Sequence, residues 1–487
     1  MLFSYIKRLK KNCKITINKT YGIYKQVLFV KSIEKNYNTP IKLARLYGFL
    51  SIKGIKMDIS GIVGFVFMIC MTVVLFATKV SPGIVFITLP VVAGIFSGFS
   101  FREIAIYVSV GIRTVIPLAF MFAFAILFFG LLNETGIFAM LVSKILGKAK
   151  KNSKSIFFMT VIVSATAHLS GSGAVSYLVI LTACKPIYEQ NGIPLTKLMC
   201  LSSLTFGVMN MLPWAGPCGR LAGALTIDAA AIWKRCIPSQ LFGLVLLFFI
   251  AYIMANGQNE NMQEKRTGEE KKTLLKKENN TTETEKKKIA FCIVCTGTVI
   301  ILLGVTQIQP FQIFLGGTLI LIFVNEKAER RKLLVKYWKQ AQTMVFTVLA
   351  SGVVVGIVTY SPMLKNMTRI ISNLIPEDVA EHMHVILGVI SNPISLVLSG
   401  EVEIFGLVPI AAELVAAKGI ASEMVAAAFL IPYSAVIFVL PMTVSVHLGL
   451  SICGVSLREH MKQTYFWSLF LSIGMLSFAV IIGMISF

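Results

Sequence analysis

Charged side chains are scarce in this sequence, and acidic ones are scarcer than basic ones. Only 14% of the 487 residues are Asp, Glu, Lys or Arg, and 46 basic residues stand against 23 acidic ones. A soluble chain carries roughly a quarter charged residues. The shortage excludes an ordinary water-soluble enzyme or binding module of this length.

The sequence also lacks the residue patterns of an enzyme that works inside a membrane. It contains no H-E-x-x-H motif and no paired aspartates at the middle of an apolar segment. Ser170 and Ser172 have no Lys or Asp on a matching segment that could activate a hydroxyl nucleophile. The nine cysteines are scattered, and the Cys292-x-x-Cys295 pair has no histidine or second pair nearby. We therefore expect neither an enzyme nor a cofactor of the protein's own.

Long apolar runs are what the sequence has in abundance. Examples are ISGIVGFVFMICMTVVLFA (59–77), SQLFGLVLLFFIAYIMA (239–255) and WSLFLSIGMLSFAVIIGMISF (467–487). They reach or approach the roughly 20 residues that a helix needs to cross a bilayer. Since such runs recur along nearly the whole chain, the sequence predicts an all-α polytopic protein with many crossings of a bacterial-type cell (inner) membrane.

Two sets of apolar segments follow one another in the same order, each with three spans, a helical hairpin, an interrupted span and a final span. The first set is expected at 59–79, 82–100, 117–134, 155–187, 195–230 and 236–255. The second set is expected at 289–306, 309–324, 342–360, 383–416, 422–456 and 465–486. The predicted regions are a basic N-terminal arm (1–56), a first membrane repeat (57–255), a charged flexible cytoplasmic linker (256–288) and a second membrane repeat (289–487).

The N-terminal arm carries thirteen basic side chains and a single acid, Glu34. Beside so many membrane segments, this charge predicts orientation in the membrane or contact with lipid rather than nucleic-acid binding. The other basic clusters of the chain can all be cytoplasmic in one orientation, but the arm would then have to be translocated. MDISGIVGFVF, beginning at Met57, is typical of a short natural N-terminus. We therefore predict that Met57 is the functional start and that residues 1–56 are dispensable.

The number of crossings sets the relation between the two halves. Each set makes five full crossings and one hairpin that returns to its own side. An odd number of crossings turns the second set upside down relative to the first. Inverted repeats of this kind are typical of secondary transporters, which bind solutes near the midplane where interrupted helices meet. A passive channel would not need such paired interruptions.

One sequence phrase occurs in both sets. Leu169-Ser170-Gly171 matches Leu398-Ser399-Gly400, and Leu212-Pro213 matches Leu440-Pro441. Gly and Ser suit a hairpin tip at which a helix stops inside the membrane, and Pro removes a backbone donor from a span. Helix N-termini there favour an anion, and freed carbonyl groups favour a hard cation. The same device therefore predicts an anion site beside a cation site.

The predicted site combines the two hairpin tips with the two interruptions. Its substrate-binding candidates are Ser170, Gly171, Ser172, Gly173, Asn210, Pro213, Trp214, Gly216, Arg220, Ser399, Gly400, Pro441, Thr443 and Ser445. The candidates for a coupling ion or metal are Glu401, Glu403, Asp228 and Asn392. Arg220 is the candidate partner of a substrate carboxylate, with an interfacial role as the alternative. His168 and His447 are interpreted as hydrogen-bonded structural residues, with titration as the alternative.

With these segments in view, the chain resembles the citrate–divalent metal:proton symporters (CitMHS-like) of the ion transporter superfamily. The resemblance covers about 57–487 and rests on LSGSGAVSYLVI, NMLPWAGPCGRLAGAL, EIFGLVPIAAEL and PMTVSVHLGLSICGVSLREH. It implies uptake of citrate, usually as a complex with a divalent metal, driven by protons. It also implies an elevator-type movement of hairpins and interrupted helices against a scaffold, and a homodimer.

The chain departs from the family pattern at two places. Ser170 and Ser172 stand where the family's first tip is acidic, of the form D-G-D-G, and 213–217 is Pro-Trp-Ala-Gly-Pro instead of Pro-Trp-Gly-Gly-Pro. These departures leave the metal dependence and the coupling ion open. We predict a secondary active transporter of citrate or a related di- or tricarboxylate, with or without a divalent metal, coupled to protons or another cation. The alternative is a cation/proton antiporter or another anion carrier of the superfamily.

Overall fold

The computed structural model describes residues 59–487, apart from 79, 138–139, 141–152, 258–282, 307, 326–328, 442 and 487. The basic arm, its predicted boundary at Met57 and most of the charged linker lie outside these described residues. The described part of the chain forms helices joined by turns, and no strand occurs within it.

The first half opens with three helices, α3 (Ile59–Ala77), α4 (Pro82–Phe96) and α5 (Phe101–Glu134). An interrupted pair follows, made of α7 (Ser153–Ala167), the 3₁₀ turn η1 (His168–Ser170) and α8 (Gly173–Gln190). A second interruption separates α9 (Leu195–Met209) from α10 (Gly216–Leu225), and α11 (Ala229–Asn256) completes this half.

The second half has the same order of elements. It opens with α13 (Glu283–Val305), α14 (Pro310–Val324) and α15 (Arg330–Thr359). The interrupted pair is α18 (Met383–Ile394) with α19 (Gly400–Val402), the π-helical turn η3 (Glu403–Leu407) and α20 (Val408–Ala416). The last elements are α21 (Ser422–Val436), α22 (Val444–Cys453) and α23 (Leu457–Ile481).

Three pairs of corresponding helices in the two halves have equal lengths. Helices α4 and α14 both have 15 residues, α9 and α21 both have 15, and α10 and α22 both have 10. The chain is interrupted at 171–172 in the first half and at 399 in the second. The helix boundaries therefore repeat in the same register as the sequence phrase.

Two short helices of the second half have no predicted counterpart, α16 (Pro362–Ser372) and α17 (Glu377–Glu381). Lys418, which follows α20, forms ion pairs with Glu377 (3.3 Å) and Glu381, and so closes the open end of the α18–α20 pair. The hydrogen bond from the Lys418 ammonium group holds the pKa of the Glu381 carboxyl group below its usual value.

The predicted start of the third span at 117 is wrong, because α5 begins at Phe101. Ser100 and Glu103 form a capping box, in which the Ser100 amide donates to the Glu103 carboxylate at 2.7 Å and the Glu103 amide donates to Ser100 Oγ. Pro117 lies inside this 34-residue helix rather than at its start. The predicted start at 342 is wrong for a similar reason, since α15 begins at Arg330 with charged turns that precede its apolar part.

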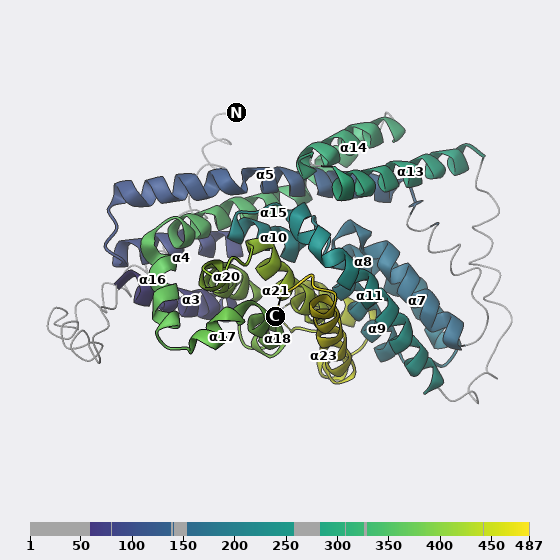
Figure 1. Cartoon of the computed structure of the whole chain (residues 1–487). Coiled ribbons are helices and arrows are strands. Elements are labelled where there is room, and N and C mark those ends of the chain that lie inside the picture. Colours follow the sequence, from purple (N-terminus) through teal and green to yellow (C-terminus); the bar gives the residue numbers. More distant parts are fainter. Residues whose placement is uncertain are drawn as a thin grey trace, which may run out of the picture. The chain divides into compact units, whose positions relative to one another are not determined.

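Helices α5 and α15 lie side by side over much of their lengths (Figure 1). A Cβ atom added at Gly111 would overlap the backbone of Gly352 and Gly356, so only glycine permits this crossing. Small residues allow such close approach of helices in membranes. Because α4 and α14 pack on this pair as well, and α3 and α13 pack on α4 and α14, we call α3–α5 and α13–α15 the scaffold group.

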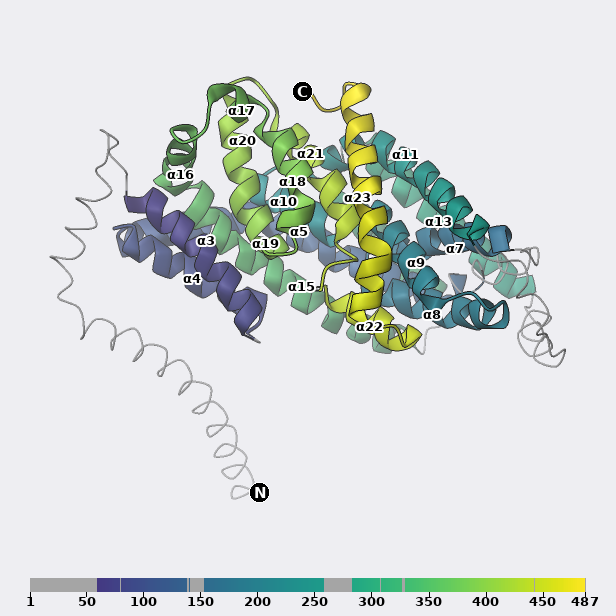
Figure 2. The same cartoon turned by 90° about the horizontal axis from the view of Figure 1, so that it is seen from below.

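The interrupted helices form a second group, α7–α11 with α18–α23, which we call the hairpin group. Within it the two halves exchange contacts. Helix α22 of the second half packs on α8 of the first (Figure 2), and α10 of the first half packs on η3 and α20 of the second. Each hairpin is therefore held against the interrupted helix of the other half.

Five of the described helices are long and apolar enough to cross a bilayer alone. They are Phe101–Glu134, Ala229–Asn256, Lys287–Val305, Arg330–Thr359 and Leu457–Ile481. Shorter apolar helices of 10–17 residues account for most of the remaining spans. They include α21 and α22, the two helices on either side of the second interruption. Interrupted spans are expected to consist of such short pieces.

Candidate functional site

The first hairpin tip is a short 3₁₀ turn that ends in a left-handed residue. Gly171 follows η1 with φ 68° and ψ 4°, a conformation that glycine adopts without steric cost. Ser170 Oγ donates to the Ala167 carbonyl oxygen (3.3 Å) and accepts from the Ser172 amide (3.3 Å). The two serines at the predicted tip therefore stabilise the interruption itself, and α8 starts at Gly173 with its amide groups at the tip.

Trp214, from the interruption between α9 and α10, holds this tip in place. Its indole Nε1 donates to the Leu169 carbonyl oxygen at 2.8 Å. A Cβ atom at Gly171 would lie 3.0 Å from Trp214 Cδ1, so the indole ring lies directly against the glycine. The ring also stacks on Phe129 of α5 at a centroid distance of 5.5 Å. The tip, the first interruption and the scaffold group thus meet at one tryptophan.

A cavity of about 470 Å³ opens between this tip and the scaffold group. Its walls include the predicted residues Ser170, Gly171, Ser172, Trp214 and Gly216. The opposite walls come from α5 and α15 and include Phe129, Asn133, Lys336, Tyr337 and Gln340. The volume lies within the range of small-molecule sites, and the mixture of apolar walls with a few polar groups is also typical of them.

The charge at the cavity wall is balanced within the scaffold group. Lys336 Nζ lies 2.6 Å from Glu134 Oε1, and the Tyr337 hydroxyl donates to the same oxygen at 2.5 Å. Lys336 is half-exposed, so this pair is open to solvent. The positive charge of Lys336 at the cavity wall is therefore paired with a carboxylate.

The second hairpin tip brings several predicted residues together. Ser399 is the N-cap of α19, and Gly400 starts that helix against α21. A Cβ atom at Gly400 would overlap the hydroxyl of Tyr433, so the second tip lies in direct contact with α21. A π-helical turn begins at Glu403, and such turns are frequent at functional sites.

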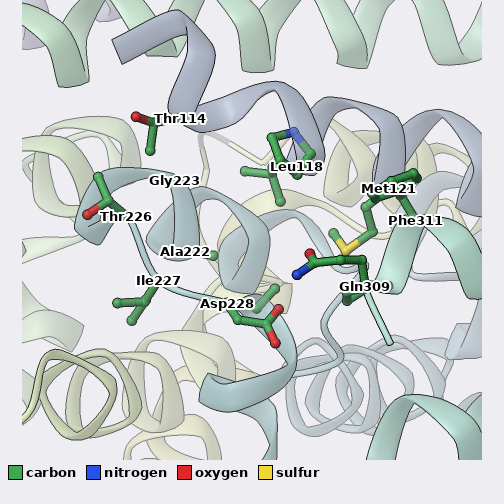
Figure 3. Close-up of a pocket in the computed structure, with 13 residues that line it drawn as sticks. Thr114, Leu118, Met121, Ala222, Gly223, Thr226, Ile227, Asp228, Gln309 and Phe311 are labelled. Carbon is green, nitrogen blue, oxygen red and sulfur yellow. The ribbon is translucent and has the colours of Figure 1, made fainter. Parts of the chain in front are cut away.

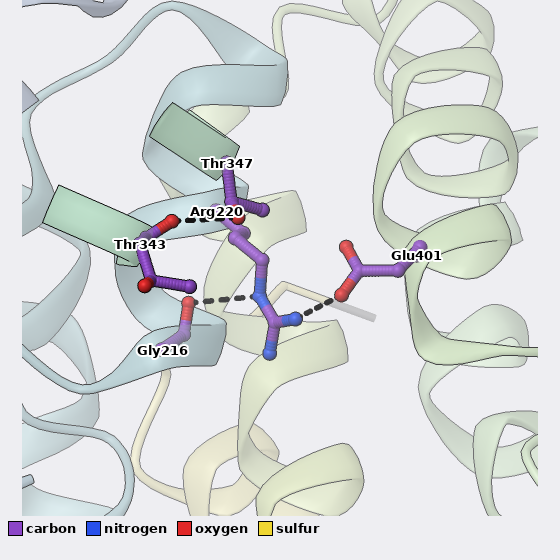
Figure 4. A network of polar contacts seen from close by, with 5 residues as sticks. All are labelled: Gly216, Arg220, Thr343, Thr347 and Glu401. Atoms are coloured by element: carbon purple, nitrogen blue, oxygen red, sulfur yellow. Dashed lines mark hydrogen bonds and ion pairs between the residues drawn. The ribbon is translucent and has the colours of Figure 1, made fainter. Parts of the chain in front are cut away.

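Arg220 and Glu401 form an ion pair between the two halves of the chain. Arg220 Nη1 donates to Glu401 Oε1, and Arg220 Nε donates to the Gly216 carbonyl oxygen at 3.1 Å (Figure 4). The side chains are mostly buried, with exposed fractions of 23% and 16%. Helix α15, which carries Thr343 and Thr347 in the same view, packs on α10. The predicted carboxylate partner and a predicted coupling residue are therefore direct neighbours.

Glu403 is fully buried and follows Glu401 of this ion pair by two residues. Ser395 Oγ donates to Glu403 Oε1 at 2.7 Å, whereas Glu403 Oε2 has no hydrogen-bond partner in the described structure. Asn392, on α18, is also buried, and its Nδ2 donates to Ser472 Oγ at 2.6 Å. Carboxyl groups buried in a membrane protein without a cationic partner are typical of proton relays and ion sites.

The second interruption, at 437–443, lies against the first tip. A Cβ atom at Gly173 would lie 2.6 Å from Phe438 and 2.7 Å from Ser445 Oγ. Three freed carbonyl groups of this interruption accept from side chains. The donors are Thr443 Oγ1 to Ile437 O (2.6 Å), His460 Nε2 to Phe438 O (3.0 Å) and His447 Nε2 to Pro441 O (2.6 Å). The protein itself therefore satisfies carbonyl groups that the sequence suggested as cation ligands.

His168 packs where the first hairpin meets both interruptions. Its Nδ1 lies 2.9 Å from Ser176 Oγ and its Nε2 lies 3.5 Å from Asn210 Oδ1. The ring stacks on Phe206 and meets the edge of Phe438. Asn210 is almost fully buried, as is the neighbouring Pro213.

Asp228 lies apart from both tips. It caps α11 by accepting from the Ala230 amide at 3.1 Å, and it lines a second cavity of about 230 Å³ (Figure 3). Thr114, Thr226 and Gln309 supply the other polar side chains of this cavity. The structure thus distributes the predicted residues over the first-tip cavity, the Arg220–Glu401 pair, the second interruption and this separate cavity.

Two residues at these places were not predicted from the sequence. Tyr433 touches the second tip from α21, and His460 holds the Phe438 carbonyl group from α23. The only signal for Tyr433 is a tyrosine next to Pro432 in an otherwise apolar helix. His460 lies in the polar first turn of α23, where its sequence context does not distinguish it from a surface residue.

Comparison with known proteins gives consistent results. The family model described as citrate transporter (CitMHS) matches residues 47–479. A citrate transporter of Bacillus subtilis (strain 168) is 28% identical over 431 residues, which are 88% of this chain and 99% of that protein. A Mg(2+)/citrate complex secondary transporter of the same organism is 26% identical, over 87% of this chain and 99% of that protein. The crystal structure of the Alcanivorax borkumensis YdaH transporter shares the fold, with a TM-score of 0.55, 14% identity, and coverage of 78% of this chain and 88% of that one.

Proposed function

Since the chain belongs to the citrate transporter family, we propose that it is a secondary active transporter of citrate or a related di- or tricarboxylate. Family membership makes it a transporter rather than an enzyme, and a multi-pass protein of a bacterial-type cell membrane. The substrate enters alone or as a complex with a divalent metal, and its uptake is coupled to protons or another cation.

The observation that carries the proposal is the cavity at the first hairpin tip. The start of α8 and the Trp214–Gly216 segment both border it, and helix starts of this kind favour anions. Arg220 is hydrogen-bonded to the carbonyl group of Gly216, which lines the cavity. A guanidinium group is the side chain best suited to bind a carboxylate with two parallel hydrogen bonds. This arrangement favours an organic anion over a bare cation.

Movement in this proposal is of the elevator type. The hairpin group carries the substrate across the membrane while the scaffold group stays in place, and the two halves are inverted repeats. The equal lengths of corresponding helices and the exchanged contacts of α8 with α22 and of α10 with η3 support this division. A homodimer built through the scaffold group is part of the same proposal.

Coupling is assigned to the second tip. Glu403 is buried and accepts one hydrogen bond, from Ser395. One carboxylate oxygen of Glu401 has no hydrogen-bond partner in the described structure. With serines at the first tip instead of acids, these two carboxyl groups are the candidates that take up a proton or contact a metal ion carried with the substrate. The relative described as a Mg(2+)/citrate complex secondary transporter supports a metal as part of the cargo.

The proposal predicts that Arg220→Gln weakens citrate binding. Loss of a charge-assisted contact to a carboxylate removes about 1.5–3 kcal/mol, or roughly 10- to 150-fold in affinity. Binding of citrate, simple dicarboxylates and gluconate to purified protein, each with and without Mg²⁺ or Ca²⁺ and across pH, measures the effect and identifies the substrate. Arg113→Gln, at an exposed arginine of α5, is the matched control and leaves binding unchanged.

Two results would contradict the proposal. Citrate uptake that is unaffected by Arg220→Gln would remove the assigned carboxylate partner. A purified wild-type protein that binds none of these carboxylates, yet exchanges cations for protons in vesicles, would favour the cation/proton antiporter of the same superfamily.

A further inference from the structure

The ion pair between Arg220 and Glu401 ties together the parts of the protein that form the predicted site. Arg220 lies in α10, directly after the first interruption, and Glu401 lies at the second hairpin tip, 181 residues away in sequence. Figure 4 shows the two side chains extending toward each other from separate helices. The pair is therefore a direct contact between the two halves of the chain.

Each partner uses only part of its hydrogen-bonding capacity in this pair. Glu401 accepts through Oε1, while its Oε2 is buried without a partner in the described structure. Arg220 donates through Nη1 to Glu401 and through Nε to Gly216, and no described residue accepts from Nη2. Guanidinium and carboxylate groups usually pair through two parallel hydrogen bonds. The Arg220–Glu401 pair has only one of these two hydrogen bonds.

The unused Arg220 nitrogen lies close to Gly216, a residue that lines the cavity at the first tip. A Cβ atom at Gly216 would lie 3.4 Å from Arg220 Nη2, and Gly216 lines that cavity. Because Gly216 has no side chain, nothing from this residue separates Nη2 from the cavity. Met344 of α15 lines the same cavity, and α15 packs on α10, the helix that carries Arg220.

We infer that Glu401 occupies the place of a substrate carboxylate on Arg220 in the empty carrier, and that the arriving substrate displaces it. The inference rests on the proposed function and assigns a regulation to the same site. A substrate carboxylate that approaches from the cavity can engage Nη1 and Nη2 together, which Glu401 does not. The ligand class is an organic anion with at least one free carboxylate group.

Displacement also leaves Glu401 free to act. Its carboxylate then needs a new partner. The neighbouring Gly400 lies against the Tyr433 hydroxyl, and Glu403 follows two residues after Glu401. A proton, or the divalent metal of a substrate complex, supplies the missing charge. Substrate binding and cation binding are therefore linked through one exchange of partners, with no covalent step.

The test measures citrate binding to the purified full-length protein, with and without Mg²⁺, by calorimetry. Glu401→Gln keeps the side-chain shape but removes the competing charge, so citrate affinity is expected to rise about 5- to 30-fold over wild type. Glu401→Asp keeps the charge on a shorter side chain and should give a smaller rise. Glu189→Gln, which removes a carboxylate from the exposed Lys185–Glu189 pair, is the control and leaves the affinity unchanged.

Thermal unfolding separates this role from a purely structural one. Without citrate, Glu401→Gln melts at a lower temperature than wild type because Arg220 loses its partner. With citrate, the rise in melting temperature is larger in the variant than in wild type, since the ligand restores that partner.

The possible outcomes are distinct. Wild-type binding together with unchanged or weaker binding by Glu401→Gln and Glu401→Asp overturns the inference and leaves the proposed function in place. If wild type binds no carboxylate at all, the proposed function fails and the inference fails with it. Tighter binding in the variant supports both.

Discussion

Thr226 has a backbone conformation that residues with a side chain avoid. It ends α10 with φ 57° and ψ 39°, and it is the only residue other than glycine with positive φ among the described residues. At the matching place in the second half, Gly454 ends α22 with φ 68° and ψ 30°. Left-handed backbone costs a non-glycine residue roughly 1–2 kcal/mol. The strained residue Thr226 lines the second cavity, together with Asp228.

Thr226→Gly is expected to stabilise the protein by about 1 kcal/mol, because glycine removes the strain and loses only part of the gain to chain entropy. Gly454→Ala should destabilise it by a similar amount of about 1 kcal/mol. A Cβ atom at Gly454 meets nothing within 4 Å, so the conformation alone decides that effect. Unfolding of the purified variants in detergent measures both changes. A loss of stability in Thr226→Gly would show that contacts of the threonine side chain outweigh the strain.

Single residues also show what the sequence could and could not predict. The first hairpin tip was predictable because Gly171 and Ser170 act on their own backbone within a few residues. Ser399 precedes α19 at the second tip without a side-chain hydrogen bond. The contact of Tyr433 with the second tip could not be predicted, because its hydroxyl reaches Gly400 only when α21 packs on that tip. Arg220 and Glu401 were each proposed as site residues, but their pairing across 181 residues has no signal in a single sequence.

Among the helices, the apolar cores were easier to locate than the ends. Hydropathy placed α4, α14 and the starts of α9 and α21 to within a few residues, because each apolar run begins with its helix. It failed for α5 and α15, whose first turns carry polar and charged residues and are defined by capping or by packing rather than by hydrophobicity. The short α16 and α17 were missed for the same reason, since they are not apolar enough to form spans.

Trp214 supplies one of the hydrogen bonds between the α9–α10 interruption and the first hairpin. Trp214→Phe removes the bond from Nε1 to the Leu169 carbonyl oxygen and leaves that oxygen unpaired. We expect a loss of about 1–3 kcal/mol in stability and weaker citrate binding, because the tip that borders the cavity is no longer fixed. Unfolding and binding are measured on the same preparation.

Tyr188→Phe is the matched control for this variant. The Tyr188 hydroxyl also forms a buried hydrogen bond, with Thr160 Oγ1 at 2.9 Å, but Tyr188 does not border the first-tip cavity. It should lose a similar stability and keep its citrate affinity. Equal effects of both variants on affinity would mean that Trp214 acts only through global stability.

For the molecule as a whole, the two helix groups differ in how they meet. Helices α5 and α15 of the scaffold group cross with glycines in backbone contact, which leaves no room for sliding. Helix α10 of the hairpin group meets α5 through side chains, with Leu118 Cδ2 3.2 Å from the place of a Cβ atom at Gly223. Contacts through side chains can shift past one another more readily than interlocked backbones. A carrier built this way should move along the α5–α10 interface and stay rigid at the α5–α15 crossing.

Cross-linking tests this division of the molecule. Cysteines introduced as Leu118→Cys and Gly223→Cys, in a chain whose nine native cysteines are replaced, join α5 to α10 through a short bifunctional thiol reagent. If the hairpin group must move, the cross-link abolishes citrate uptake into vesicles while citrate still binds to the locked protein. The control pair, Thr114→Cys with Tyr360→Cys, joins α5 to α15 at a place where the native hydroxyl groups lie 3.0 Å apart. That cross-link stays within the scaffold group and should leave uptake intact. Uptake that survives the α5–α10 cross-link would rule out a movement of the hairpin group against the scaffold group. The linked helices could no longer slide past each other along the membrane normal.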